Sequence, residues 1–250
     1  MKRAAIFLAA ILGGLRTFAA PPDLTPTTTA VLNPVAEGRQ LAERLRSSGP
    51  AENSEFHGTL IIRRRGAQTN RVPVHSTITT STTNWQVTYQ TTATTATPVE
   101  KLTIIRAPGC ANEYWFSRAT NPPAALPAGQ ADAPFAGSDF LLSDLALEFL
   151  HWPGQKLIKH EMRRGRSCRV LESVNPNPGT NGYARLLSWI DVETDGILRA
   201  EAYDQKTNLV KEFLVGPVKK VNGQWQLQDM KMILPKTRHE TELQFDLDRK

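Results

Sequence analysis

The sequence predicts a mainly β protein in which one antiparallel sheet curls into an incomplete barrel. From about residue 55, apolar residues recur at every second position, which is typical of strands with one buried and one solvated face. Asp195-Gly196 and Asn222-Gly223 are strong hairpin signals between alternating segments. The pattern gives about ten or eleven strands, more than a flat open sheet holds well without curling or closing.

The N-terminus has the pattern of a secretory signal peptide. A basic start, Met1-Lys2-Arg3, precedes an apolar run from Ala4 to Leu15 and then small residues up to Ala20. The apolar run is too short for a permanent membrane-spanning helix. We therefore expect cleavage after about Ala19 and a periplasmic mature protein, with an uncleaved anchor as the less favoured alternative.

Charge gives no argument for nucleic acid as a partner. The whole chain has a net charge of +6, but residues 1–19 contain three basic residues and no acidic one, so the mature charge falls to +3. The one dense basic run, Arg63-Arg64-Arg65, ends an apolar strand. A solvated strand end is the default interpretation, and a docking surface for a partner or an anionic head group is the alternative.

One helix is expected before the strands begin. Residues 20–32 are rich in Pro and Thr and read as a flexible leader, and residues 33–250 read as a single β domain. Asn33 is a good N-cap and Pro34 a good first helical residue. The apolar stripe of this helix comprises Val35, Leu41, Ala42 and Leu45.

The first half continues with strands whose alternate residues are apolar. Leu60 and Ile62 share one face, as do Trp85, Val87 and Tyr89. Segment 76–97 is very rich in Thr, which suits exposed strand faces. The series continues with Leu102 and Ile104 and then with Trp115, which stands between two further aromatic residues.

A Pro/Ala-rich loop at 119–136 leads into a short predicted helix. Ser143 is the expected cap, with Asp144 in the first turn, where the helix dipole favours an acid. Leu145 and Phe149 are four residues apart and share one helix face. Trp152-Pro153-Gly154 then ends the helix.

The C-terminal half is a predicted meander. A first hairpin, 155–162 with 167–173, closes near Arg164-Gly165. Five further strands are expected, at about 183–193, 196–204, 209–220, 224–234 and 237–247. With so few helices to cover a sheet, a curled sheet whose concave side is plugged by helices fits the pattern best.

No motif points to catalysis, a cofactor or a metal. The chain has no nucleophile elbow, no phosphate-binding Gly-rich loop and no metal-spaced cluster of histidines or cysteines. We therefore predict no enzyme activity. Export would permit a disulfide between Cys110 and Cys168, although two free thiols are nearly as well supported by the spacing.

An ordered set of short motifs resembles the outer-membrane lipoprotein-sorting, or LolA/LolB-like, family. Gly137-Ser138-Asp139-Phe140 with Asp144-Leu145 is similar to its first signature, and Cys168 lies in a second similar strand. The segments Ser188–Asp191 and Leu198–Lys211 are similar to two later strands. Together these motifs cover roughly residues 137–215.

This resemblance implies a half-open β-barrel with an N-terminal helix and a short lid helix on its concave side. It also implies a monomeric carrier that binds the acyl chains of lipoproteins, or phospholipid, and exchanges them with membrane-bound donor and acceptor proteins. The lid candidates are Phe140, Leu142, Leu145 and Phe149. The barrel-side candidates are Leu60, Ile62, Trp85, Val87, Trp115 and Trp189. For each of them, ordinary core packing is the competing interpretation.

Two other functions stay open at this point. The same fold can serve as an envelope sensor or interaction module that binds a lipoprotein or peptide without transport. A hydrolase with an unrecognised site is the third alternative. Transfer of bound lipid separates the carrier from the sensor, and turnover identifies a hydrolase.

Overall fold

A computed structural model describes residues 33–95, 97–127, 129–178, 182–221 and 224–247. The predicted signal peptide (1–19) and leader (20–32) lie outside the described residues. No helix in the described ranges is both long enough and apolar enough to span a membrane.

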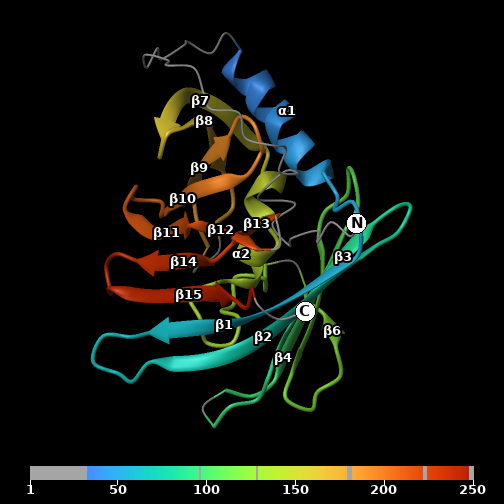
Figure 1. Cartoon of the computed structure of the whole chain (residues 1–250). Coiled ribbons are helices and arrows are strands. Elements are labelled where there is room, and N and C mark those ends of the chain that lie inside the picture. The colour runs from blue at the N-terminus through green and yellow to red at the C-terminus, as the bar shows by residue number, and fades with distance from the viewer. Residues whose placement is uncertain (1–32, 96, 128, 179–181, 222–223, 248–250) are drawn as a thin grey trace.

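One curled, antiparallel sheet of 13 strands dominates the fold and does not close on itself (Figure 1). Its order is β6-β5-β4-β3-β2-β1-β15-β14-β11-β10-β9-β8-β7. The first half contains β1 (Ser54–Arg63), β2 (Asn70–Thr80), β3 (Trp85–Thr91), β4 (Glu100–Arg106), β5 (Glu113–Arg118) and β6 (Ala124–Ala125). The second contains β7 (Gly154–Arg163), β8 (Arg166–Val174), β9 (Arg185–Asp191), β10 (Ile197–Tyr203), β11 (Leu209–Val215), β14 (Asp229–Leu234) and β15 (His239–Phe245). The predicted curled sheet is confirmed.

Helix α1 (Pro34–Ser47) begins as predicted, with the Asn33 side chain accepting a hydrogen bond from the Ala36 amide. It packs on β7, at one end of the sheet (Figure 1). Leu41, Ala42 and Leu45 are buried, but Val35 is exposed, so its assignment to the apolar stripe was wrong. Val35 lies in the first turn, before the helix meets the sheet, and only the residues from Gly38 onward include buried ones.

The main core lies on the concave face of the sheet. Buried and more exposed residues alternate strictly along strands β3 and β4. The odd-numbered residues of β3 and the even-numbered residues of β4 point inward. The inner faces of both halves share one apolar cluster with α1 and the segment after residue 134. A much smaller cluster lies apart from it and comprises Cys168, Val170 and Trp189.

The predicted second helix is broken into two single turns. Helix α2 (Leu142–Leu145) is followed by the 3₁₀ turn η2 (Glu148–His151), and Leu147 between them has a left-handed backbone with φ of 51°. Ser143 is not the cap. The Asp144 carboxylate instead accepts from the Leu141 amide at 2.8 Å, and the Ser143 hydroxyl donates to Asp132.

Two of the long predicted strands are interrupted. The segment expected at 209–220 ends at Val215, and the next residues form β12 (Val218–Val221), which pairs only with β13 (Gln224–Leu227) in a separate hairpin. Asn222-Gly223, the predicted turn of that hairpin, lies outside the described residues. The turn predicted at Arg164-Gly165 joins β7 to β8, with positive φ at both residues, as a tight primed hairpin turn requires.

The two cysteines are free, so no disulfide joins them. Cys110 is exposed in the turn between β4 and β5, whereas Cys168 is buried in β8, in the opposite half of the sheet. Burial, together with the nearby Asp191 carboxylate, raises the pKa of the Cys168 thiol to about 11.

We expect a thiol reagent at pH 8 to modify one cysteine in the native protein and two after denaturation. Only the thiolate reacts, and Cys168 is both protonated at this pH and shielded. Mass spectrometry after labelling with iodoacetamide checks this, and peptide mapping identifies the labelled site. Loss of both labels in the unreduced, denatured protein would instead establish a disulfide.

Candidate functional site

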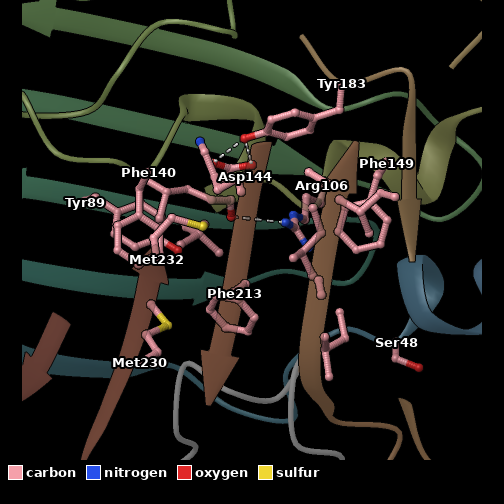
Figure 2. A pocket seen from close by; sticks show the side chains of 18 of the residues that line it. Ser48, Tyr89, Arg106, Phe140, Asp144, Phe149, Tyr183, Phe213, Met230 and Met232 are labelled. Atoms are coloured by element: carbon pink, nitrogen blue, oxygen red, sulfur yellow. Dashed lines mark hydrogen bonds and ion pairs between the residues drawn. The ribbon is translucent and has the colours of Figure 1, made fainter. Parts of the chain in front are cut away.

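The candidate site is an apolar cavity between the inner face of the sheet and the lid segment, defined here as residues 137–151 (Figure 2). Its volume is about 90 Å³. One wall comes from β2, β3 and β4, and the facing wall from β9, β10, β11 and β14. The lining includes Ile78, Trp85, Val87, Tyr89, Arg106, Phe140, Leu145, Leu147, Phe149, Tyr183, Leu186, Ile197, Ala200, Ala202, Lys211, Phe213, Met230 and Met232.

The facing wall combines very small and very adaptable side chains. Ala200 and Ala202 of β10 line the cavity. Met230 and Met232 point into it from β14 (Figure 2). Alanines leave space that a ligand can use. Methionine has three rotatable bonds and repacks around irregular shapes at low cost. This wall can therefore change its shape more readily than a wall of β-branched residues.

The lid segment contributes the other cover of the cavity. Phe140, Leu145, Leu147 and Phe149 all line it, although they come from a bend, from α2 and from η2. The left-handed backbone at Leu147 changes the direction of the chain between Leu145 and Phe149. An apolar cover that is not one continuous helix can move in parts.

A buried polar cluster ties the lid segment to the sheet. The Lys211 ammonium group donates to the Asp139 carbonyl oxygen at 2.7 Å and to the Asp144 carboxylate at 3.0 Å. The Tyr183 hydroxyl donates to the same carboxylate at 2.9 Å (Figure 2). Burial and the Asp144 charge raise the pKa of Tyr183 well above its usual value, so this hydroxyl stays a donor.

A second set of polar contacts holds the start of the lid segment. The Asp139 carboxylate accepts from Arg64 at 2.7 Å and from the Thr241 hydroxyl at 2.7 Å, and the Asp139 amide donates to the same hydroxyl. Arg64 also donates to the Gly137 carbonyl oxygen. Arg64, which the sequence places at a solvated strand end, therefore forms an ion pair with the buried Asp139 carboxylate. Asp139, Asp144 and Lys211, from separate motifs of the sequence, meet in one place.

Among the described residues that line the cavity, Arg106 is the one arginine, and it is only 8% exposed. Its Nη2 donates to the Leu145 carbonyl oxygen of the lid at 3.5 Å (Figure 2). Burial lowers the pKa of this guanidinium, while the nearby Tyr89, Tyr114 and Glu148 oppose that shift. A buried cation in an apolar wall is a marker of function.

The sequence placed some of the candidate residues at this cavity and others away from it. Trp85, Val87, Phe140, Leu145 and Phe149 line it. Leu60, Ile62 and Leu142 are buried in the adjoining core and do not line it.

The other two tryptophans among the candidate residues, Trp115 and Trp189, were assigned to the wrong side of the sheet. Trp115 is 41% exposed, because Tyr114 and Phe116 on either side of it pack toward the core. It borders a second, more polar hollow with Asn112 and Glu148. Trp189 packs with Cys168 and Val170 in the small separate cluster, where its indole donates to Glu161 at 2.7 Å.

Several cavity residues were missed. Met230 and Met232 alternate along a predicted strand, so their shared face could have been found from the sequence. Lys211 stands in a matched motif, which was the available signal for it. Arg106 ends an apolar strand like any solvated arginine, and no local pattern distinguishes it. In the described ranges, no cluster of three or more His, Cys, Asp or Glu side chains could hold a metal ion.

Comparisons with known proteins agree with this fold. A family model described only as "uncharacterized protein"-like matches residues 88–247. No curated protein matches the sequence. Crystal structures with the same fold include a DUF1329 family protein from Desulfovibrio piger, with a TM-score of 0.68 and 19% identity, covering 86% of this chain and 92% of that chain.

Two further structures extend the likeness. A putative outer membrane lipoprotein-sorting protein domain from Vibrio parahaemolyticus has a TM-score of 0.68 and 19% identity, covering 85% of this chain and 91% of that one. A LolA superfamily protein from Nitrosomonas europaea has a TM-score of 0.57 and 14% identity, with coverage of 85% and 91%. The predicted LolA-like fold and the resemblance stated from the motifs are confirmed.

Proposed function

Because this chain belongs to the family whose model matches residues 88–247, a family described only as uncharacterised, we propose its function from its cavity. The protein is a periplasmic carrier that binds the acyl chains of lipoproteins or other lipids for sorting to the outer membrane. The observation that carries this proposal is an apolar cavity covered by a segment that polar contacts fasten to the sheet.

The energetics of lid opening suit a carrier. The cavity of about 90 Å³ is much smaller than ligand pockets of roughly 300–1,000 Å³, so a chain enters only when the lid moves. Removing about 14 methylenes from water yields about 11 kcal/mol. Breaking the buried contacts of Lys211 costs about 3–5 kcal/mol, which leaves a surplus for binding. With this gain and this cost, the lid is closed when the cavity is empty and open when an acyl chain is bound.

The predicted signal peptide and the relatives' names support the location and partners. The Vibrio protein is described as a putative lipoprotein-sorting protein, and such a role places a carrier between two membranes. We infer membrane-bound donor and acceptor proteins, a monomeric carrier, and no cofactor, nucleic acid or catalytic step.

Native mass spectrometry of the mature protein purified from periplasm tests the proposal, followed by solvent extraction of the bound lipid. We expect co-purified lipoprotein or phospholipid with the wild type and loss of it with Phe149→Glu, which places a charge in the cavity wall. Val192→Glu is the matched control, because Val192 is exposed in the turn after β9. Ala200→Leu is the second variant, since it fills the cavity without adding charge.

A lipid-free mass, with no uptake of added phospholipid or acylated peptide, contradicts the carrier proposal and favours an interaction module. Retention of lipid in both Phe149→Glu and Ala200→Leu shows that the lipid binds elsewhere. Transfer of bound lipid to acceptor vesicles then separates a carrier from a sensor, which holds its ligand.

A further inference from the structure

Arg106 sits in the cavity without a partner that matches its charge. Lys211, the other cation of the wall, is neutralised by the Asp144 carboxylate at 3.0 Å. For Arg106, the described residues provide no ion pair, and its one hydrogen bond is to a neutral carbonyl oxygen at 3.5 Å. Burying a cation in this way destabilises the folded protein unless an opposite charge or further hydrogen bonds compensate for the lost hydration.

Two poorly satisfied donors of Arg106, Nε and Nη2, lie on one edge of the guanidinium group. Nε is buried and has no hydrogen-bond partner, and Nη2 makes only the long contact to Leu145. Nε–H and Nη2–H point in parallel and form the edge that grips the two oxygens of a carboxylate. Arg106 therefore has two parallel N–H donors in position to bind a carboxylate, and among the described residues they bind none.

Glu148, the acidic side chain whose charge acts on Arg106, is hydrogen-bonded to other residues. The Glu148 carboxylate accepts hydrogen bonds from the Asn112 amide at 2.7 Å and from the Tyr114 hydroxyl at 2.5 Å, on the side of the second hollow. The Leu145 carbonyl oxygen that faces Arg106 belongs to the lid segment. Displacement of the lid would remove the one acceptor that Arg106 contacts among the described residues, and would free its Nε–H and Nη2–H for a ligand.

We propose that Arg106 binds the carboxylate of a long-chain fatty acid whose hydrocarbon chain lies along the apolar wall of the cavity. This inference rests on the proposed lipid-binding function and names free fatty acids among the other lipids that the cavity binds, because they carry an anionic group that ester- or amide-linked acyl chains lack. The charge of the carboxylate replaces the weak contact to Leu145, and the alanine and methionine wall accommodates the chain.

The test compares palmitate with methyl palmitate, which has the same chain but no charge, in binding to the mature protein by displacement of a fluorescent lipid. We expect the wild type to bind the acid at least tenfold more tightly than the ester. Arg106→Gln should remove this preference, so that the acid and the ester bind with affinities within twofold of each other. Arg71→Gln, at an exposed position of β2, is the matched control and should keep the preference.

Arg106→Lys serves if the glutamine variant does not fold, and it should keep a reduced preference because the charge remains but the fork is lost. Equal affinity of wild type for acid and ester overturns the inference while leaving the carrier proposal intact. So does a preference that persists in Arg106→Gln. Binding of neither lipid contradicts the carrier proposal itself.

Discussion

Lys211→Met is expected to lower the free energy of unfolding by about 3 kcal/mol and to loosen the lid. Methionine keeps the length and apolar stem of lysine, so the change isolates the ammonium group. Its loss leaves the largely buried Asp144 carboxylate with two neutral donors, the Tyr183 hydroxyl and the Leu141 amide, but without a counter-charge, and it removes the partner of the Asp139 carbonyl oxygen. Removing one member of a buried pair costs far more than losing a surface ion pair.

Urea unfolding followed by tryptophan fluorescence measures this loss, and hydrogen exchange locates it. The amides of Leu142 and Ser143, which donate to the carbonyl oxygens of Ala133 and Ala131, should exchange much faster in the variant. Lys231→Met is the control, because Lys231 is partly exposed, lies near Glu240 and Glu242, and should change stability by less than about 1 kcal/mol. Equal effects of the two variants would show that the lid does not depend on Lys211.

Gly38→Leu is expected to destabilise the protein by about 3 kcal/mol or more. A Cβ atom at Gly38 would lie 2.5 Å from the Lys156 Cα and 2.6 Å from the Leu157 amide nitrogen. Both are backbone atoms of β7 and cannot rotate away. Leucine favours helix over glycine by close to 1 kcal/mol, so the clash must exceed that gain to give a net loss. We expect it to do so because α1 has to lift off the sheet.

Ala36→Leu is the matched control, since Ala36 is exposed on the same helix and should shift stability by less than about 0.5 kcal/mol. Thermal unfolding of both variants provides the comparison. Because α1 also contacts η2, its displacement should carry Phe149 away from the cavity and weaken lipid binding as well. A Gly38→Leu protein as stable as wild type would mean that α1 does not press on β7.

The sequence predicts where the strands of this protein lie better than it predicts which of their residues face the core. Alternation placed Trp85 and Val87 on the inner face because their neighbours are polar. It failed at Trp115, where three successive aromatic residues give no phase, and at Trp189, which is covered on the other side of the sheet. There the guanidinium groups of Arg163 and Arg199 stack on the indole ring and exclude water from it.

The lid was predicted in position but not in form. Leu145 and Phe149 have helical spacing, yet the chain turns at Leu147, and Glu148 meets Tyr114 and Asn112 on β5 and the turn before it. That contact spans more than thirty residues, and no local propensity encodes it. Lys211, which contacts both Asp139 and Asp144, is likewise remote in sequence, so the matched motifs marked these residues as important without revealing this contact.

The pairing of β1 with β15 in the middle of the sheet has a consequence for how the protein folds. Each half of the sheet consists mainly of strands that follow one another in sequence, so each can assemble from nearby segments (Figure 1). The seam between them joins Gly58 to Phe245 and has to wait for the last strand. Such remote pairing slows folding. In a chain that emerges N-terminus first, the apolar face of the first half of the sheet stays exposed to solvent until β15 pairs with β1. The polypeptide is most prone to aggregation during that interval.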